Sequence, residues 1–353
     1  MSALTEVRRA HATRRPLAAV AGLVGFLVTV AIYFGAAKAG IGAIALPLVM
    51  LIMIPLLIFG SRLVSRGLPR APGRQSSAVL LAPASFYLVF FVVPLVLLAV
   101  YSLSTQSGFG QITFGFSLDS YREALSGVYI QSFGTSLLYA LLGTIATIVV
   151  GFPFAYWLTR HAPAPQRQLL AALVMVPFWT SSLIRTYAMI AILSENSALA
   201  DGLRQLGLIG DKLGLLYQPG GVFIGLVYGY LPLCVLPLYS TLERMDWSLV
   251  QAASDLGASK LKAFTQITLP LAMPGVLTAG LLVFIPMTGE YIIPGILGGG
   301  QVQFIGNVIQ SAFIEQQNYP FGAAVGMLVM LCLSVVMVIY VVSSVRSERK
   351  LSV

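Results

Sequence analysis

Glu290 is an ionisable residue within an apolar stretch that runs over residues 272–297. A carboxylate inside a bilayer costs several kcal/mol unless it is paired or hydrated, so such a residue is a functional candidate by default. Glu290 follows Ala272 by about 18 residues, or about 27 Å of helix, which predicts a position toward the outer third of a membrane. A broken helix end beside a carboxylate can hold an ammonium group, and residues that interrupt helices flank it: Pro286, Gly289, Pro294 and Gly295.

Aromatic side chains of the apolar segments could add cation–π contacts to a cation held at Glu290, each contributing about 0.5–2 kcal/mol. The candidates for a substrate path are Phe178, Trp179, Tyr187, Tyr230 and Tyr291, with Tyr228 beside them. Anchoring of aromatic rings at the membrane interface explains most of them equally well. Arg185 repels a cation, so it favours either a pair with Glu290 or a zwitterionic or acidic solute. Glu290 could also lie simply among the lipid headgroups.

A second candidate site is the polar stretch at 247–275, which has apolar segments on both sides. Ser248 and Gln251 fit a capping box, in which two side chains satisfy backbone amides at a helix start, so we expect a helix from Leu249. Ala252 and Ala253 favour this helix, and their small side chains keep its surface free of protrusions. A helix lying on the membrane surface is the alternative, but it requires a marked apolar face and basic flanks.

Gly257 is expected to end this first helix, because glycine readily adopts the positive φ of a helix stop. Asp255 precedes it in the last turn. A second short helix is predicted from Ser259 to Ile267, and Leu269 and Pro270 follow, with the proline ending the helix. The pair would form a knob that projects from the membrane and fits a groove of a partner.

The elements that position both sites are predicted to be membrane-spanning helices. The chain has 353 residues, 58% hydrophobic and 9% charged, whereas soluble domains are about 25% charged. A span needs roughly 20 apolar residues. Strands of a β-barrel would alternate polar with apolar residues, which these segments do not. We therefore expect an all-α polytopic bundle with eight spans: 17–36, 41–60, 79–100, 133–158, 169–193, 222–239, 272–297 and 321–342.

Basic residues set the orientation of such a bundle, because Lys and Arg are retained in cytoplasmic loops during insertion. With both termini inside, 16 of the 21 Lys and Arg residues are cytoplasmic, and the other five are Lys38, Arg122, Arg185, Arg204 and Lys212. The basic loops that orient the chain during membrane insertion thus explain the net charge of +9, and no nucleic-acid partner is expected. The chain is therefore predicted to cross the lipid bilayer several times, with both termini in the cytoplasm.

No residues point to covalent chemistry, and we expect no catalytic site, no metal and no enzymatic activity. Cys234 and Cys332 lie in apolar segments without a C-x-x-C partner, as buried structural thiols do. His11 and His161 have no second ligand nearby. Gly298 to Gly300 are three consecutive glycines, but the Lys-Ser/Thr of a P-loop does not follow them. This chain is therefore expected to bind no cofactor of its own.

Two regions follow from this reading of the chain. Residues 1–76 comprise a basic N-terminus and a tight hairpin of two spans, and residues 77–353 comprise six spans. A signal peptide is the alternative for the first span, since residues 37–39 loosely imitate a cleavage site, but its apolar run is long. The predicted outside connections, 101–132, 194–221 and 298–320, are acidic, as would suit a cationic cargo.

Several motifs resemble one family: GFPFAY at 151–156, VPFWTSSLIRTY at 176–187, LPLYS at 236–240, DLGASK at 255–260, GEYIIP at 289–294, LGG at 297–299, IGN at 305–307 and PFGAA at 320–324. They are similar to those of permease subunits of bacterial ABC importers, of the first-subunit type in the spermidine/putrescine permease family. The resemblance begins near Ser77, so the leading hairpin is extra to the six-span type I permease core.

That family has a cytoplasmic coupling loop, which the resemblance places at 243–271. Its motif residues here are Gln251, Ala252, Ala253, Asp255, Gly257, Ile267, Leu269 and Pro270. The family usually has Glu where this chain has Gln251, so a salt bridge at that position would be lost. The resemblance implies a separate ATPase docked on this loop.

The resemblance implies a complete importer of two permeases, two ATPase subunits that bind and hydrolyse ATP, and an external solute-binding protein. This chain would form half of the translocation path for a small cationic substrate, and a polyamine is the first candidate for that substrate. The alternatives are another small amine, an amino acid or an opine-like solute. An ion-coupled secondary transporter or channel would need carboxylates or polar stripes in several spans, and Glu290 alone gives it little support.

Overall fold

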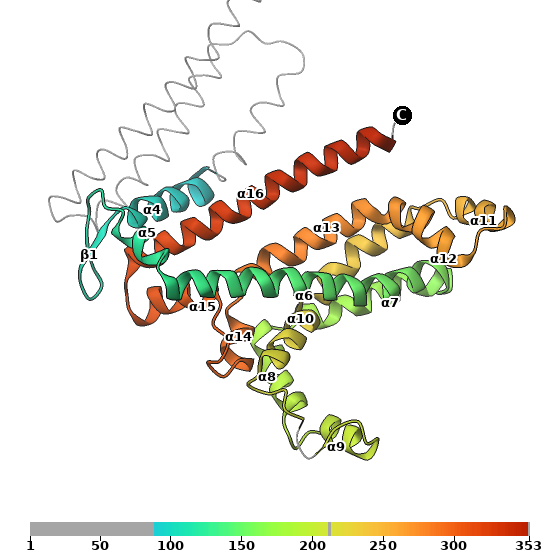
Figure 1. The fold of residues 1–353 in the computed structure, drawn as a ribbon, viewed down its shortest axis with the longest axis horizontal. Coiled ribbons are helices and arrows are strands. Elements are labelled where there is room, and N and C mark those ends of the chain that lie inside the picture. The colour runs from blue at the N-terminus through green and yellow to red at the C-terminus, as the bar shows by residue number, and fades with distance from the viewer. Residues whose placement is uncertain (1–87, 211–212, 352–353) are drawn as a thin grey trace, which may run out of the picture. The chain divides into compact units, whose positions relative to one another are not determined.

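The computed structural model of the chain describes residues 88–210 and 213–351, with side chains from residue 90 to residue 340 except at 164 (Figure 1). They belong to two compact units, Met1–Ser117 and Leu118–Val353. The spans predicted at 17–36 and 41–60, and the boundary predicted between residues 76 and 77, lie outside the described residues.

The described part of the first unit is a short apolar helix followed by a hairpin. A π-turn, η1 (Leu88–Val92), leads into α4 (Val93–Ser102). The strands β1 (Thr105–Gly108) and β2 (Gln111–Thr113) then pair antiparallel. Helix α4 covers the end of the span predicted at 79–100 and runs two residues further.

The second unit is helical throughout the part that the structure describes. Its elements up to the polar loop are α5 (Asp119–Ala124), α6 (Gly127–Arg160), α7 (Ala164–Met175), η2 (Val176–Trp179), α8 (Ser182–Leu193), α9 (Ala198–Gln205) and α10 (Pro219–Glu243). Those that follow are α11 (Ser248–Asp255), α12 (Lys260–Ala263), η3 (Phe264–Thr268), α13 (Leu269–Thr288), α14 (Ile292–Leu297), α15 (Ile305–Gln310), η4 (Ser311–Glu315) and α16 (Tyr319–Leu351).

Four helices of the described chain are long and apolar enough to cross a membrane: Gly127–Arg160, Pro219–Glu243, Lys260–Thr288 and Tyr319–Tyr340. A fifth span is present if the bent pair Pro165–Trp179 and Ser182–Gln205 counts as one, and Phe90–Ser102 is a shorter apolar helix. The all-α prediction is confirmed. The helices predicted at 133–158, 222–239 and 321–342 lie inside the observed ones.

The span predicted at 169–193 is not one straight helix, because the helices on either side of a break in this segment meet at 92°. Pro177 opens a short 3-10 turn, and Thr180 and Ser181 are extended rather than helical. The Thr180 hydroxyl donates to the Pro177 carbonyl over 2.7 Å, which satisfies one of the carbonyls left at the helix end. The apolar composition of the segment gave no signal of this bend.

The span predicted at 272–297 is likewise interrupted, with α13 ending at Thr288 and α14 beginning at Ile292. A continuous helix would place the ring of Pro294 against the carbonyl of Glu290 and remove a hydrogen bond. After the break, Pro294 lies in the first turn of α14, where proline is tolerated. The interruption that the prolines and glycines predicted is therefore a complete break.

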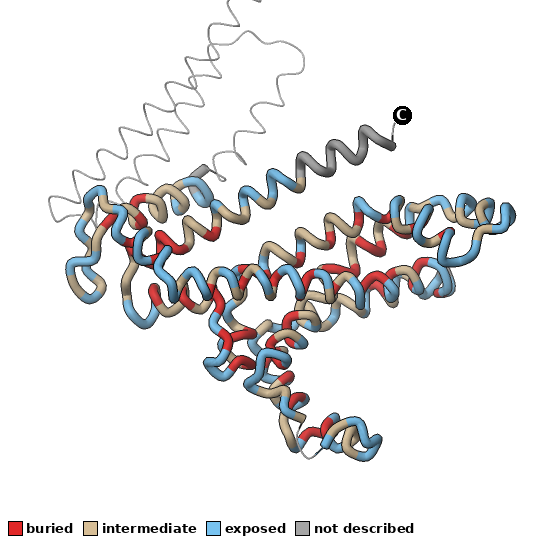
Figure 2. Tube along the Cα trace, in the orientation of Figure 1, coloured by how far each residue is buried: buried red, intermediate tan, exposed pale blue. Residues whose placement is uncertain are grey.

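Helices α6, α10 and α13 pack against one another and form the centre of the second unit (Figure 1). Small residues recur every three or four positions along the buried side of α6, among them Ala140, Thr144, Thr147, Gly151 and Ala155. Such residues let helix backbones approach closely where lipid supplies no hydrophobic drive for association. Figure 2 shows this pattern, with buried positions on the facing sides of these helices.

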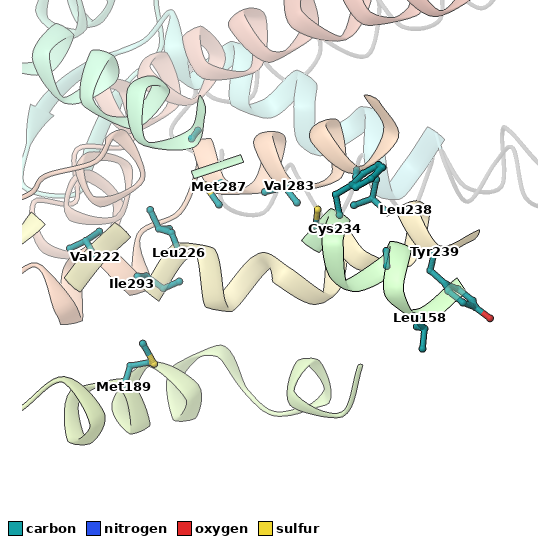
Figure 3. Close-up of a cluster of buried hydrophobic side chains, with 14 of the residues drawn as sticks. Leu158, Met189, Val222, Leu226, Cys234, Leu238, Tyr239, Val283, Met287 and Ile293 are labelled. Atoms are coloured by element: carbon teal, nitrogen blue, oxygen red, sulfur yellow. The ribbon is translucent and has the colours of Figure 1, made fainter. Parts of the chain in front are cut away.

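Large side chains from the other helices fill the space beside this small-residue surface. Leu226 and Leu238 of α10, with Val283 and Met287 of α13, are buried in the cluster of Figure 3. Cys234 is a free and buried thiol, as predicted, and its Sγ lies 3.6 Å from the Thr147 carbonyl. Cys332 is half-buried. Tight packing here holds the frame that carries both candidate sites.

Candidate coupling loop and helix break

The polar loop begins differently from the capping box predicted at Ser248 and Gln251, and that prediction was wrong. Helix α11 begins at Ser248, and the side chain of its N-cap residue, Trp247, makes no capping hydrogen bond. Instead, Oδ1 of Asp246 accepts the Ser248 amide hydrogen over 2.9 Å. Hydrogen bonds from Ser248 lower the pKa of Asp246. Because this carboxylate reaches the first amide, the helix starts one residue earlier than predicted.

Gly257 ends α11 as the sequence predicts, with φ of 86°. The amide of Ala258 donates to the carbonyl of Ala253, and that of Gly257 donates to Ser254, each over 2.9 Å. These two bonds form a Schellman motif, in which glycine is favoured because a Cβ is strained at positive φ. A Cβ at Gly257 would meet nothing within 4 Å, so only the backbone conformation requires glycine there.

The helix after Gly257 is longer than predicted, and Pro270 does not end it. Ser259 caps α12 through its Oγ, which accepts the Lys262 amide hydrogen over 3.3 Å. A single helix then runs from Lys260 to Thr288. The π-turn η3 lies directly before Pro270, and its wider hydrogen-bond spacing accommodates a residue that has no amide hydrogen. The second helix of the loop is thus continuous with a membrane-spanning helix.

Leucine side chains protrude from the loop. Leu256 is 90% exposed, and Leu261 and Leu249 are also exposed. Of the predicted coupling residues, the exposed ones are Gln251, Ala252, Asp255, Gly257 and Pro270, and the half-buried ones are Ala253, Ile267 and Leu269. Large apolar side chains at an exposed tip are typical of a surface that binds another protein.

Aromatic side chains at the base of the loop fix it to α6, and sequence reasoning missed them. Tyr156 packs against Trp247 and Phe264, with ring centroids 5.6 and 6.1 Å apart. Phe152 also meets Phe264, at 5.7 Å. The guanidinium of Arg160 lies 5.4 Å from the centroid of Trp247. The signal for this cluster was an apolar residue at the start of each loop helix, but its partners lie about 100 residues away in the sequence.

Glu290 lies at the break between α13 and α14, and hydrogen-bond donors surround its carboxylate. Tyr230 donates its hydroxyl hydrogen to Oε2 over 2.6 Å. The amides of Tyr291 and Ile292 donate to Oε1 over 3.1 and 2.9 Å. The carboxylate therefore joins α10 to the first turn of α14 and compensates two amides freed by the break.

Asn307 and Gly306 of α15 hold the other side of the break. Asn307 donates through Nδ2 to the carbonyl of Tyr291 over 2.8 Å, and its Oδ1 accepts the Phe304 amide hydrogen over 3.2 Å. A Cβ at Gly306 would lie 2.5 Å from the carbonyl oxygen of Gly289. The start of α15 therefore packs directly against the non-helical backbone. The IGN motif carried this information, but its role depends on a tertiary contact.

Arg185 does not pair with Glu290, since no ion pair joins them among the residues that the structure describes. Nη1 of Arg185 donates instead to the Gly229 carbonyl over 3.2 Å. Its guanidinium lies 5.5 Å from the ring centroid of Phe178, and its buried Nε has no partner. Arg185 thus ties α8 to α10 at the turn that carries Tyr230.

The structure separates the aromatic candidates into three groups. Tyr230 and Tyr291 lie at the break, where they make the hydrogen bonds described above. Phe178 lies under Arg185. Trp179 and Tyr187 are 80% and 61% exposed, so they belong to the outer surface of this chain.

An open hollow of about 580 Å³ adjoins the break. Leu183 of α8 lies on one side, and the remaining lining comes from α14, the loop after it, α15 and η4. Tyr291 and Asn307, which both take part in the break, also line this hollow. Elsewhere among the described residues, no group of three or more His, Cys, Asp or Glu side chains is arranged to hold a metal ion.

A helical bundle with a broken span and a protruding polar loop fits a membrane transport protein, and comparison with known proteins gives its family. Residues 148–352 match the family described as binding-protein-dependent transport system inner membrane component. The chain belongs to this family. It is thus an inner-membrane component of an ABC transporter.

Named relatives narrow the comparison. The chain is 39% identical over 255 residues to the spermidine/putrescine transport system permease protein PotB of Escherichia coli (strain K12), covering 72% of this chain and 92% of that protein. Identity to the protein of the same description from Haemophilus influenzae is 36% over 265 residues, covering 75% and 92%.

A solved structure matches the fold at lower sequence identity. It is described as a bacterial ABC transporter involved in the import of the acidic polysaccharide alginate. The TM-score is 0.58 at 18% identity, with 78% of this chain and 95% of that chain covered. The expected permease architecture is therefore confirmed for the greater part of the chain.

Proposed function

We propose that this chain forms half of the translocation path of an ATP-driven polyamine importer. Family membership supports the transport role, and the relatives named for spermidine and putrescine support the substrate. Another small amine, an amino acid or an opine-like solute is the alternative cargo. The partners in this proposal are a second permease, two ATPase subunits and an external binding protein.

The observation that carries the proposal is the coupling loop. An exposed helix ends at Gly257, and leucines protrude on both sides of this stop, at positions 256 and 261. The following helix continues without interruption into the bundle. A partner that grips this tip can therefore move a spanning helix as one body. ATP would be bound and hydrolysed by that partner, with the loop and both termini of this chain on the cytoplasmic side.

The proposed path passes the break between α13 and α14. Backbone that departs from helix at membrane depth is tolerated where it is buried in protein or lines a water-filled cavity. In this proposal the residues that face the cargo during transport are Phe178, Trp179, Tyr187, Tyr230, Glu290 and Tyr291. Glu290 could receive an ammonium group only after its bond to Tyr230 has opened.

Replacement of Gly257 tests the coupling role. In proteoliposomes that contain the complete importer, we expect Gly257→Asp to abolish ATP-driven spermidine uptake while the complex still inserts. Gly207→Asp is the matched control, because Gly207 has φ of 68° and its Cβ would also meet open space. Both changes strain a glycine backbone, but only the first alters the loop. Full transport by Gly257→Asp would remove the assignment.

A second measurement separates this function from an ion-coupled transporter. ATP turnover should rise when the binding protein presents spermidine, and uptake should stop when ATP is withdrawn. Uptake that continues without ATP in membranes with a proton gradient would favour the secondary transporter. A panel of solutes on the binding protein would distinguish polyamines from amino acids and opine-like compounds.

A further inference from the structure

The hollow beside the helix break contains a second carboxylate that the path described so far does not use. Glu315, at the end of η4, lines this hollow together with Tyr291 of the break. Its volume of about 580 Å³ is within the range of sites that bind small molecules. It therefore offers both the space and a charge for a solute.

The two carboxylates of this region differ in what already bonds to them. Glu290 accepts three hydrogen bonds, from one tyrosine and two amides, which use both of its oxygens. Glu315 accepts one hydrogen bond, from the Ser311 hydroxyl to Oε2 over 2.7 Å, and its side chain is exposed. Glu315 can therefore bind a cation without first losing a bond within the protein.

The remaining lining of the hollow favours a cation over other solutes. No Lys or Arg is among the described residues that line it, so the carboxylate is not neutralised there. Side-chain amides add carbonyl oxygens, at Gln303 and Gln310, and Tyr291 adds an aromatic face. Ammonium groups bind carboxylates, amide carbonyls and aromatic faces. The carboxylate, the amide oxygens and the aromatic face are thus suited together to an organic amine that is longer than a single ammonium ion.

We propose that this hollow is an outer subsite for an organic polyamine and that Glu315 is its cation-binding carboxylate. The inference rests on the proposed import function, because it adds a place where the cargo waits before it reaches the break. Ser311 is a positioning residue that orients the carboxylate. One ammonium would bind at Glu315, and a second, further along the chain of the amine, would lie toward Tyr291.

Charge removal at Glu315 tests this subsite in the reconstituted importer. We expect Glu315→Gln to lower the amount of spermidine imported per ATP hydrolysed by about tenfold, the factor that one charged contact gives to an affinity. ATP turnover stimulated by the loaded binding protein should stay unchanged, because the coupling loop is intact. Glu123→Gln is the matched control, since Glu123 is another exposed carboxylate of the same unit and lies outside the hollow.

A filling substitution tests the space rather than the charge. Leu183 is 47% exposed and lines the hollow, so Leu183→Trp should reduce its volume without changing its charge. Its import per ATP should fall in the same way as that of Glu315→Gln. Import at the level of the unmodified complex would contradict the subsite.

Direct binding can be measured without transport. In a Cys332→Ser background, where Cys234 remains buried, a Leu183→Cys thiol lines the hollow and leaves Glu315 in place, and it should react with a trimethylammonium-bearing methanethiosulfonate. Millimolar spermidine should slow that reaction several-fold, whereas sodium chloride of equal ionic strength should not. The same assay on Glu123→Cys should show no protection by spermidine.

The outcomes distinguish this inference from the proposed function. If the unmodified complex imports spermidine, and Glu315→Gln and Leu183→Trp import as much per ATP without protection of the Leu183→Cys thiol, the subsite is refuted and the importer stands. If the unmodified complex imports no polyamine while spermidine still protects the thiol, the import function fails and the subsite remains. Protection together with the lowered ratio supports both.

Discussion

The helix break and the coupling loop both depend on glycine, but for opposite reasons. At the break, Gly306 is required by close contact, since a Cβ would lie 2.5 Å from the Gly289 carbonyl oxygen. In the loop, Gly257 has open space around it and is required by its φ of 86°. The break is thus a packed joint with satisfied polar groups. The loop is a defined backbone shape with an exposed apolar tip.

This difference indicates how each region fails when it is changed. A substitution at the break should disturb the fold, because neighbouring atoms already fill the space. A substitution in the loop should spare the fold and disturb binding, because the leucines at its tip are exposed in the part of the chain that the structure describes. The following experiments test that division, beginning with the largest effect on stability.

Gly306→Ala should give the largest loss of stability. The added methyl would overlap the carbonyl oxygens of Gly289 and Glu290, and overpacking of this kind costs about 1–3 kcal/mol or more. We expect a lower thermal unfolding midpoint for this subunit within the purified importer. Gly134→Ala is the control, because Gly134 lies in α6 with open space around it and alanine favours helix by about 0.5–1 kcal/mol. Equal midpoints for the two variants would contradict the packed joint.

Tyr230→Phe should have a smaller effect at the same joint. It removes the hydroxyl that donates to Glu290, which leaves the carboxylate with two backbone donors. Loss of a hydrogen bond to a charged group costs about 1–3 kcal/mol. Tyr228→Phe is the neighbouring control, since the Tyr228 hydroxyl makes no hydrogen bond among the described residues. The thermal midpoint should drop for the first variant alone, and a drop shared by both would point to a general loss of tyrosine.

Leu256→Ser should leave stability unchanged to within about 0.5 kcal/mol, because the side chain is 90% exposed. Its effect should appear in partner binding, as an ATPase affinity weakened about tenfold. Retention of the ATPase on the immobilised permease measures this. Leu208→Ser, an exposed leucine in the connection between α8 and α10, should retain the ATPase fully. Undiminished retention by Leu256→Ser would exclude the tip as the contact.

The smallest effect is expected at Asp246, which holds the first amide of α11. Hydrogen bonds from Ser248 lower the pKa of Asp246, so the carboxylate stabilises the loop above the ordinary pKa of about 3.9. That contribution is lost as pH falls through the lowered pKa. Amide exchange in α11 should thus be faster in Asp246→Asn near neutral pH. The two proteins should converge as the pH falls below about 4, and a constant difference would contradict the linkage.

Local signals predicted much of the fold. Long apolar runs predicted α6, α10 and α16, because apolar composition over more than 20 residues leaves few alternatives. Gly257 was predicted as a helix stop, because positive φ is a property of the residue itself. Prolines and glycines around Glu290 predicted an interruption, and the structure has one there. In each case the cause lies within a few residues of its effect.

The predictions that failed depended on competing contacts. Ser248 was expected to cap α11, but the carboxylate of Asp246 reaches the same end of the helix. Pro270 was expected to end a helix, but a π-turn accommodates it. The aromatic base around Trp247 joins segments about 100 residues apart, which no local pattern indicates. The hollow beside Glu315 arises in the same way, from four elements that only the fold brings together.

The π-turn before Pro270 has a mechanical consequence. It lets 29 residues, Lys260–Thr288, form one helix about 43 Å long, with the loop at one end and the broken span at the other. In the proposed coupling, this helix would serve as the lever arm between the loop and the break. A tilt of about 10° applied at Lys260 would displace Thr288 by about 7 Å. The residue that was expected to separate the loop from the membrane helix is therefore part of the one helix that joins them.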